Sequence, residues 1–187
     1  MRLTGFEPIL GTNGLTVLDF WKWANSDILM NAARGVFAEY LVGSALVALD
    51  GIRIEWDAFD LKYRDNGIEV KSSAYVQSWK QKSKSKPQFT IAPKSSWRDG
   101  INTYTTEKQR QASIYVFCLL VECDQNLVNP LDTNQWLFYV ATVNNLNLLG
   151  GQKSIGLSHL KRISNECKYE SLKLTVDQTL DNITSVS

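Results

Sequence analysis

The predicted fold depends on one stretch of the chain, Glu55-Trp-Asp-Ala-Phe-Asp-Leu-Lys-Tyr-Arg-Asp-Asn-Gly-Ile-Glu-Val-Lys-Ser-Ser-Ala74. Apolar and polar residues alternate on both sides of Asn66-Gly67, as they do in half-buried β-strands. Asn-Gly between two alternating runs is the strongest short signal for a β-hairpin, because both turn positions then adopt a positive φ. We therefore predict two antiparallel strands joined by a tight turn.

Two registers of this hairpin agree with the alternation. If Asn66-Gly67 is the two-residue loop, Asp60 lies opposite Ser73; if the loop is Asp65-Asn66, Asp60 lies opposite Lys71. Both registers keep the same side chains on each face, because a shift of two residues preserves the alternation of a strand. The sequence leaves the choice between them open.

The polar face of the hairpin brings together two carboxylates and a lysine. In either register Asp60, Glu69 and Lys71 share this face. The other face carries apolar side chains only: Phe59, Leu61, Tyr63, Ile68 and Val70. A three-residue loop would bring Asp57 to the Glu69 side, but it would mix apolar and charged residues on both faces, which a half-buried sheet strongly disfavours. We therefore predict Asp60, rather than Asp57, beside Glu69.

Neighbouring carboxylates need a neutralising partner. A hard divalent cation takes oxygen ligands from one or two carboxylates and keeps several waters. Such an ion binds phosphate oxygens and lowers the pKa of a bound water, which is the chemistry of phosphodiester hydrolysis. The alternative is an ion pair between Glu69 and Lys71 on a solvated face, which would contribute less than about 1 kcal/mol.

An acid, a hairpin turn and then Glu69-Val70-Lys71 on the second strand resemble the active-site core of the PD-(D/E)XK, or restriction-endonuclease-like, nuclease superfamily. The resemblance implies an α/β fold with a central mixed sheet flanked by helices. It also implies that Asp60, Glu69 and the carbonyl of Val70 bind Mg²⁺ or Mn²⁺, and that Lys71 positions or deprotonates the attacking water. Phe59 stands where many members have a proline, a position that varies in the superfamily.

The context distinguishes this triplet from two others with the same spacing. Asp60-Leu-Lys62 and Glu166-Cys-Lys168 also read acid-x-Lys, but only Glu69-Val-Lys71 follows an acid on the same face, a turn and a buried helix. That helix is predicted over 27–49, where Glu39 is the only charged residue from Gly35 to Leu49. Glu39 either lies on a narrow solvent-exposed side of this helix or, as the resemblance implies, is a further catalytic acid near the metal.

Polar and basic residues follow the second strand. Ser73 shares the face of Glu69, and Gln77 does so if the strand stays regular. Lysines then recur at every second position and can follow phosphates as point charges, although a solvated loop explains them equally well. The predicted nucleic-acid contacts are therefore Ser73, Gln77, Lys80, Lys82, Lys84 and Lys86.

The rest of the chain supplies the elements of a single domain over 1–187, with its core at about 27–163. The near-continuous apolar run at 113–123 predicts a strand buried on both faces. Other expected elements are a strand at 135–143, helices at 105–112 and 158–163, a short helix at 17–24 packed across the core edge, an edge strand at 172–176 and a frayed tail after Asp181.

The composition of the chain limits which partners and which cellular compartment it is expected to have. Twenty basic and nineteen acidic side chains leave a net charge of +1, so any basic surface must be local. An odd number of cysteines without framework spacing, and the lack of a signal peptide or a membrane-length apolar run, favour a cytoplasmic protein without a membrane partner. The only histidine, His159, is expected at the surface or in a cap.

These observations predict a divalent-metal-dependent endonuclease-like phosphodiesterase that hydrolyses DNA. Two alternatives remain open: a nucleic-acid-binding module of the same fold that does not cleave, and a structural subunit whose polar hairpin face is an interface. The small basic surface suggests that a second copy of the chain, in a homodimer, or a partner supplies further DNA contacts.

Overall fold

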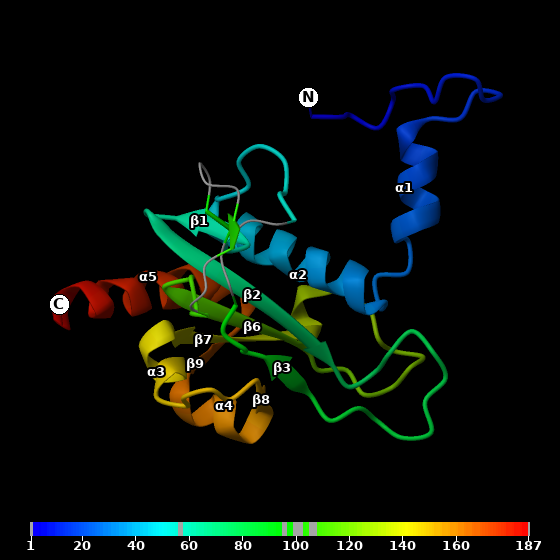
Figure 1. Cartoon of the computed structure of the whole chain (residues 1–187). Coiled ribbons are helices and arrows are strands. Elements are labelled where there is room, and N and C mark those ends of the chain that lie inside the picture. Colours follow the sequence, from blue (N-terminus) through cyan, green and yellow to red (C-terminus); the bar gives the residue numbers. More distant parts are fainter. Residues whose placement is uncertain (1, 56–57, 95–96, 99–102, 105–107, 187) are drawn as a thin grey trace.

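A five-stranded mixed sheet forms the centre of the computed structural model, which describes residues 2–55, 58–94, 97–98, 103–104 and 108–186 (Figure 1). Its strands, in spatial order, are β1 (Leu61–Tyr63), β2 (Asn66–Ala74), β6 (Ile114–Leu120), β7 (Trp136–Thr142) and β9 (Asn165–Cys167). β2 and β6 run parallel, and the other neighbours are antiparallel. The predicted α/β fold with a central mixed sheet flanked by helices is therefore confirmed.

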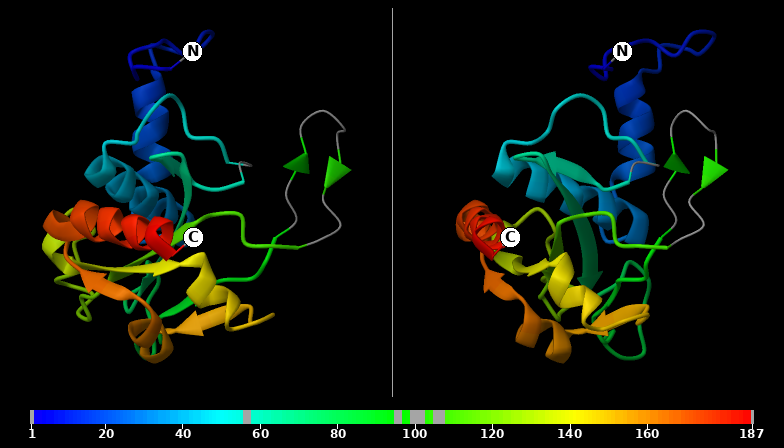
Figure 2. Two further views of the ribbon diagram at one scale, coloured as in Figure 1. Left: turned by 90° about the vertical axis from the view of Figure 1, so that its left-hand side faces the viewer. Right: turned by 60° about the vertical axis from the view of Figure 1, so that its left-hand side comes forward.

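Helices cover one face of this sheet. α2 (Asn31–Leu46) and α5 (Tyr169–Val186) pack there against an apolar cluster that includes Ile68, Val70 and Val116 (Figure 2). α2 confirms the buried helix predicted over 27–49. None of the helices in the described residues combines the length and the apolarity that crossing a membrane requires.

Smaller elements cover the opposite face, which carries Glu69 and Lys71. A second apolar cluster there joins Phe89, Phe117 and Leu160. The elements are β3 (Gln88–Thr90), which pairs with β8 (Ser154–Gly156), and the short helices α3 (Val143–Asn147) and α4 (Leu157–Ile163). Three further short elements complete the fold. β4 (Trp97–Arg98) and β5 (Thr103–Tyr104) form an antiparallel pair, and η1 (Thr133–Gln135) is a 3₁₀ helix.

The hairpin turns one residue earlier than one predicted loop, Asp65-Asn66, and two residues earlier than the other, Asn66-Gly67. Leu61 pairs with Ile68, so Arg64 and Asp65 form the loop, with φ values of 47° and 61°. Gly67 lies within β2, where a Cβ atom would come within 2.5 Å of the Phe59 ring. The glycine is thus needed for close packing rather than for the turn. The pairing differs from the nearer predicted register by two residues, so Asp60, Glu69 and Lys71 still share one face. The prediction is wrong for Phe59, which packs against the apolar cluster on the Glu69 face instead of beside Ile68 and Val70.

Three other predictions fail in identifiable ways. The expected helix over 105–112 lies partly outside the described residues, and its described end is extended, with Gln109 in a bridge to Lys94. The expected edge strand at 172–176 and frayed tail after Asp181 are instead α5. Alternation and helical spacing overlap in this segment: Leu172 and Val176 are buried, whereas Leu174 is exposed on the opposite side of the helix.

The first helix, α1 (Val17–Asn25), also departs from its prediction. It was expected to pack across the core edge, yet none of its residues is buried. Figures 1 and 2 show that it extends away from the sheet, together with the residues before it. A capping box between Thr16 and Asp19 satisfies its first turn, so the helix is stabilised locally.

An ion-pair network fastens α5 to β1. Asp177 accepts hydrogen bonds from Tyr63 at 2.8 Å, from Lys173 at 2.7 Å and from Arg64 at 3.2 Å. Burial alone would raise the pKa of Asp177, but these three donors outweigh it and lower the pKa. The carboxylate therefore stabilises the fold at neutral pH and loses that contribution as pH falls below about 4.

We expect Asp177→Asn to lower the free energy of unfolding by about 1 kcal/mol at pH 7, because the carboxylate charge that attracts Lys173 and Arg64 is lost. The difference from the wild type should shrink towards zero as pH falls below about 4, where Asp177 itself becomes protonated. Urea unfolding at several pH values measures this. Asp124→Asn, at an exposed position, is the control; a difference that is constant with pH would contradict the assignment.

Candidate active site

Asp60, Glu69 and Lys71 come together as predicted. The Lys71 ammonium lies 2.5 Å from Oε1 of Glu69 and 4.0 Å from Oδ2 of Asp60. The backbone N–H of Val70 donates to Oδ2 of Asp60 at 2.6 Å, which ties the acid on the first strand to the second. Each of these positions follows from the alternation of two paired strands. Asp57, the rejected alternative, lies outside the described residues.

Burial makes the two carboxylates electrostatically unequal. Only 5% of the Glu69 side chain is exposed, against 22% for Asp60. Burial, followed by the negative charge of Glu69, raises the pKa of Asp60 to about 6. Burial would also raise the pKa of Glu69, but Lys71 and Lys94 reverse this effect and lower it. One acid is therefore held ionised by lysines, and the other is left short of positive charge.

Lys94 is a member of this centre that sequence reasoning missed. Its ammonium lies 2.9 Å from Oε1 of Glu69, and 61% of its side chain is exposed. The backbone of Lys94 is held by paired hydrogen bonds of 3.0 Å with Gln109, fifteen positions further along the chain. No local motif surrounds Lys94, so only this long-range pairing could have identified it.

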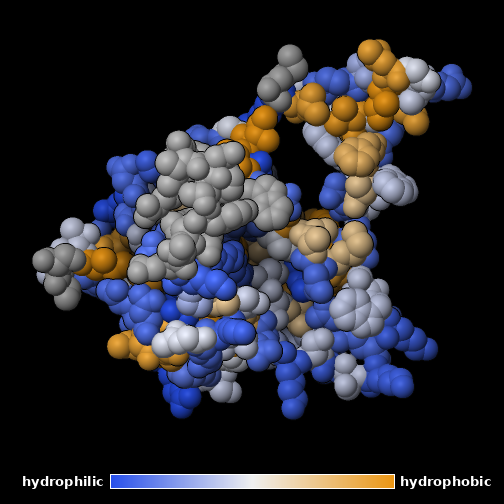
Figure 3. All heavy atoms as spheres, viewed as in Figure 1, coloured by the Kyte–Doolittle hydropathy of each residue, from blue (hydrophilic) through white to orange (hydrophobic). Residues whose placement is uncertain are grey.

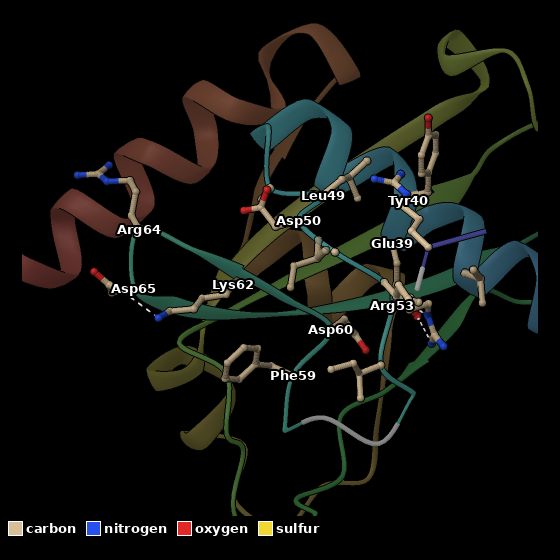
Figure 4. A pocket seen from close by; sticks show the side chains of 17 residues that line it. Glu39, Tyr40, Leu49, Asp50, Arg53, Phe59, Asp60, Lys62, Arg64 and Asp65 are labelled. Carbon is tan, nitrogen blue, oxygen red and sulfur yellow. Dashed lines mark hydrogen bonds and ion pairs between the residues drawn. The ribbon is translucent and has the colours of Figure 1, made fainter. Parts of the chain in front are cut away.

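Glu39 lies on α2 beside the centre but is already paired. Arg53 binds both of its carboxylate oxygens, with contacts of 2.5 and 2.9 Å. Figure 4 shows Glu39, Arg53 and Asp60 around one part of a cavity of about 730 Å³. Glu39 thus approaches Asp60 from the helix before the hairpin, where the sequence suggested it, with Arg53 as a partner that the sequence did not indicate.

Apolar and charged side chains line this cavity in nearly equal numbers. Side chains of α2 and of the segment that follows it form one wall, and the hairpin forms the other (Figure 4). Several of its apolar lining residues are exposed to solvent: Val36, Tyr40, Leu49, Ile52 and Ile54. The cavity therefore offers a ligand both apolar surface and charged groups of either sign.

The predicted nucleic-acid residues fall into two groups. Ser73 is buried on the Glu69 face and accepts a hydrogen bond from the N–H of Gln88 at 3.3 Å. Gln77 does not share that face, because β2 ends at Ala74; it is buried and accepts from Arg34 at 3.2 Å. The four lysines of the loop between β2 and β3 are all exposed: Lys80, Lys82, Lys84 and Lys86.

The donor set fits a hard divalent cation. Asp60 and Glu69 supply two carboxylates, and Mg²⁺ is commonly held by one or two carboxylates together with waters and substrate phosphates. Within the described ranges, no group of three or more His, Cys, Asp or Glu side chains converges as a cage. Burial raises the pKa of Asp60 most, and the negative charge of Glu69 raises it further; this second effect favours added positive charge beside the two acids. The residues present therefore suit Mg²⁺ better than a metal that requires a full protein cage.

The fold and the site define an α/β protein with a carboxylate–lysine centre where a short edge hairpin joins a mixed sheet. The family model of bacteriophage T4 endonuclease IV matches residues 17–147. The chain belongs to this family. The matched range contains Glu39, Asp60, Glu69, Lys71 and Lys94, and therefore the whole centre. Searches of curated proteins and of solved structures gave no significant match.

Proposed function

We propose that this chain is a Mg²⁺-dependent endonuclease of the PD-(D/E)XK type that hydrolyses DNA. The observation that carries the proposal is the convergence of Asp60, Glu69 and Lys71 beside a cavity, in a chain of the T4 endonuclease IV family. Mn²⁺ would replace Mg²⁺ in the same oxygen site.

Each residue has a distinct part in this proposal. The carboxylates of Asp60 and Glu69, with the carbonyl of Val70, would hold the cation, which when bound supplies charge neutralisation and a water of lowered pKa. Lys71 orients the attacking water and assists its deprotonation. Lys94, more exposed than Lys71, donates to a non-bridging oxygen of the scissile phosphate.

Two further groups support the centre. Glu39, held in place by Arg53, accepts hydrogen bonds from waters on the cavity side of Asp60. The exposed lysines of the loop between β2 and β3 contact the DNA backbone as point charges. Because Ser73 is buried, it acts by holding the N–H of Gln88, and so the start of β3, rather than by touching DNA.

The test is cleavage of linear, nicked, branched and single-stranded DNA with Mg²⁺ or Mn²⁺, and with EDTA as the control. We expect internal cuts that require the cation, and Glu69→Gln should abolish them. Cleavage that persists in EDTA would refute the metal-dependent mechanism. Salt-sensitive DNA binding without cleavage of any form would instead support the non-cleaving module.

A further inference from the structure

A second cavity, of about 670 Å³, lies between the loop before β3 and the start of α4. Its charged lining is entirely basic: Lys84 and Lys86 come from the loop, and Arg162 comes from α4. His159, partly buried on the same helix, adds an imidazole. No aspartate or glutamate is among the described residues that line it.

Among the described residues, the basic side chains of this cavity have no acidic or polar partner, in contrast to four arginines elsewhere. Arg34, Arg53, Arg64 and Arg110 all donate to carboxylates, amides or carbonyls. Across the described part of the chain, no hydrogen bond or ion pair engages the side chains of the cavity group: Lys84, Lys86, His159 and Arg162. Like charges gathered around a concave surface favour an anion, because the cavity walls concentrate their field.

The cavity lies on the same side of the sheet as the acid centre. Glu69 pairs with Tyr115 of β6, and Tyr115 belongs to the second apolar cluster. Tyr75 and Leu157, which line the cavity, pack against the same cluster. Glu69 and Tyr75 are six positions apart along β2 and its extension, which corresponds to roughly 20 Å of strand. One strand of DNA covers that distance within a few nucleotides.

We infer that this cavity is a phosphate subsite, which binds a backbone phosphate of the DNA whose scissile bond lies at Asp60 and Glu69. The inference rests on the proposed function, because it takes DNA as the substrate. Arg162 provides the planar fork that matches phosphate oxygens, and the two lysines add point charges. The subsite fixes the position of the strand relative to the acid centre and is insensitive to base identity.

DNA binding in EDTA, followed by fluorescence anisotropy over a series of salt concentrations, tests the subsite without cleavage. We expect Arg162→Gln to weaken binding about tenfold at low salt and to reduce the slope of log K against log salt by about one. The matched control is Lys161→Gln, because Lys161 is next to Arg162 on α4 but is already paired with Glu166 at 3.3 Å.

The outcomes separate the two proposals. An unchanged salt slope for both Arg162→Gln and the double variant Lys84→Gln/Lys86→Gln would overturn the subsite, even if the enzyme cleaves DNA. The subsite would also be overturned if inorganic phosphate binds in the cavity while these variants leave DNA affinity unchanged. That result would favour a site for free phosphate. A reduced slope in a protein that never cleaves would support the subsite and refute only the endonuclease assignment.

A separate observation concerns the N-terminal arm, defined as residues 2–25. The arm is ordered by its own backbone hydrogen bonds, including Leu18 N–H to the carbonyl of Gly5 at 2.8 Å and Val17 N–H to that of Glu7 at 3.0 Å. It nevertheless exposes eight large apolar side chains: Leu3, Phe6, Ile9, Leu10, Leu15, Phe20, Trp21 and Trp23. Figure 3 shows apolar surface gathered on this arm.

We propose that this arm pairs with the arm of a second copy of the chain across a two-fold axis. At about 150–250 Å² for a whole aromatic side chain, the four partly exposed aromatic side chains contribute roughly 400–600 Å² per arm. The four exposed aliphatic side chains bring the apolar area towards the roughly 800 Å² that a standard-size interface buries on each partner. The arm has two basic and two acidic side chains, so copies do not repel each other and the arm does not attract DNA: Arg2, Glu7, Asp19 and Lys22.

Sedimentation velocity of the full chain tests the pairing. We expect the wild type to have twice the mass of one chain at tens of micromolar, and Trp23→Glu and Phe6→Glu to be monomers with unchanged circular dichroism. Leu148→Glu, at an equally exposed apolar position outside the arm, should remain dimeric. A monomeric wild type, or arm variants that remain dimers, would overturn the proposal.

Discussion

Replacing Lys71 with alanine should lower the rate of DNA cleavage by about a thousandfold or more at saturating substrate. Lys71 is the only lysine of the centre within reach of both carboxylates, and positioned proton transfer typically contributes a factor of about 10²–10⁴. The protein should stay folded, because Lys94 still neutralises Glu69. Single-turnover cleavage with Mg²⁺ measures the effect.

Lys62→Ala is the matched control for this prediction. Lys62 is on the same hairpin, also in an acid-x-Lys triplet, but 65% of its side chain is exposed and it pairs only with Asp65 in the turn. Its removal should change the cleavage rate less than twofold. Wild-type cleavage by Lys71→Ala would show that the lysine is an ordinary ion-pair partner and would remove it from the mechanism.

Asp60→Asn should have two opposite effects. It should abolish Mg²⁺ binding measured by calorimetry, since it removes one of the two carboxylates that meet at Lys71 among the described residues. In EDTA it should stabilise the protein by about 1–3 kcal/mol at pH 8, because folding raises the pKa of Asp60 from 3.8 to about 6. A raised carboxyl pKa means that the wild-type fold loses stability as pH rises through about 4 to 6, and asparagine escapes this loss.

The control is Asp65→Asn, at a turn carboxylate that is 94% exposed, which should change neither metal binding nor stability appreciably. Thermal unfolding from pH 4 to pH 8 separates the variants, because the advantage of Asp60→Asn should grow with pH and level off above about 7. A variant that binds Mg²⁺ as the wild type does, or that is less stable than the wild type at pH 8, would contradict the assignment of Asp60.

The sequence was sufficient to assign Asp60, Glu69 and Lys71 to one face, because the alternation of a strand depends only on local order. It was not sufficient for the register. Asn66-Gly67 has the chemistry of a turn, but Gly67 is required where the ring of Phe59 packs on the strand. The packing of one side chain on the strand backbone thus overrode a turn preference, and this contact cannot be read from the turn sequence alone.

Partners from distant segments were the other limit. Lys94 reaches Glu69 through a pairing with Gln109, and Arg53 reaches Glu39 across the turn after α2. Gln77 was assigned to the polar face on the assumption of a regular strand, but the early end of β2 turns it towards Arg34. Each of these cases depends on how the chain folds back, and a sequence pattern carries no record of that.

The network around Asp177 has a practical consequence for anyone who handles this protein. Asp177 and Asp181 of the last helix hold Tyr63 and Arg64, the final residue of β1 and the first residue of its turn. The same short strand begins directly after Asp60. Truncating the chain before residue 177, or fusing a bulky tag that displaces α5, would therefore loosen the segment that carries Asp60, the proposed metal ligand, more than a hundred positions away. Affinity tags belong on another part of the chain.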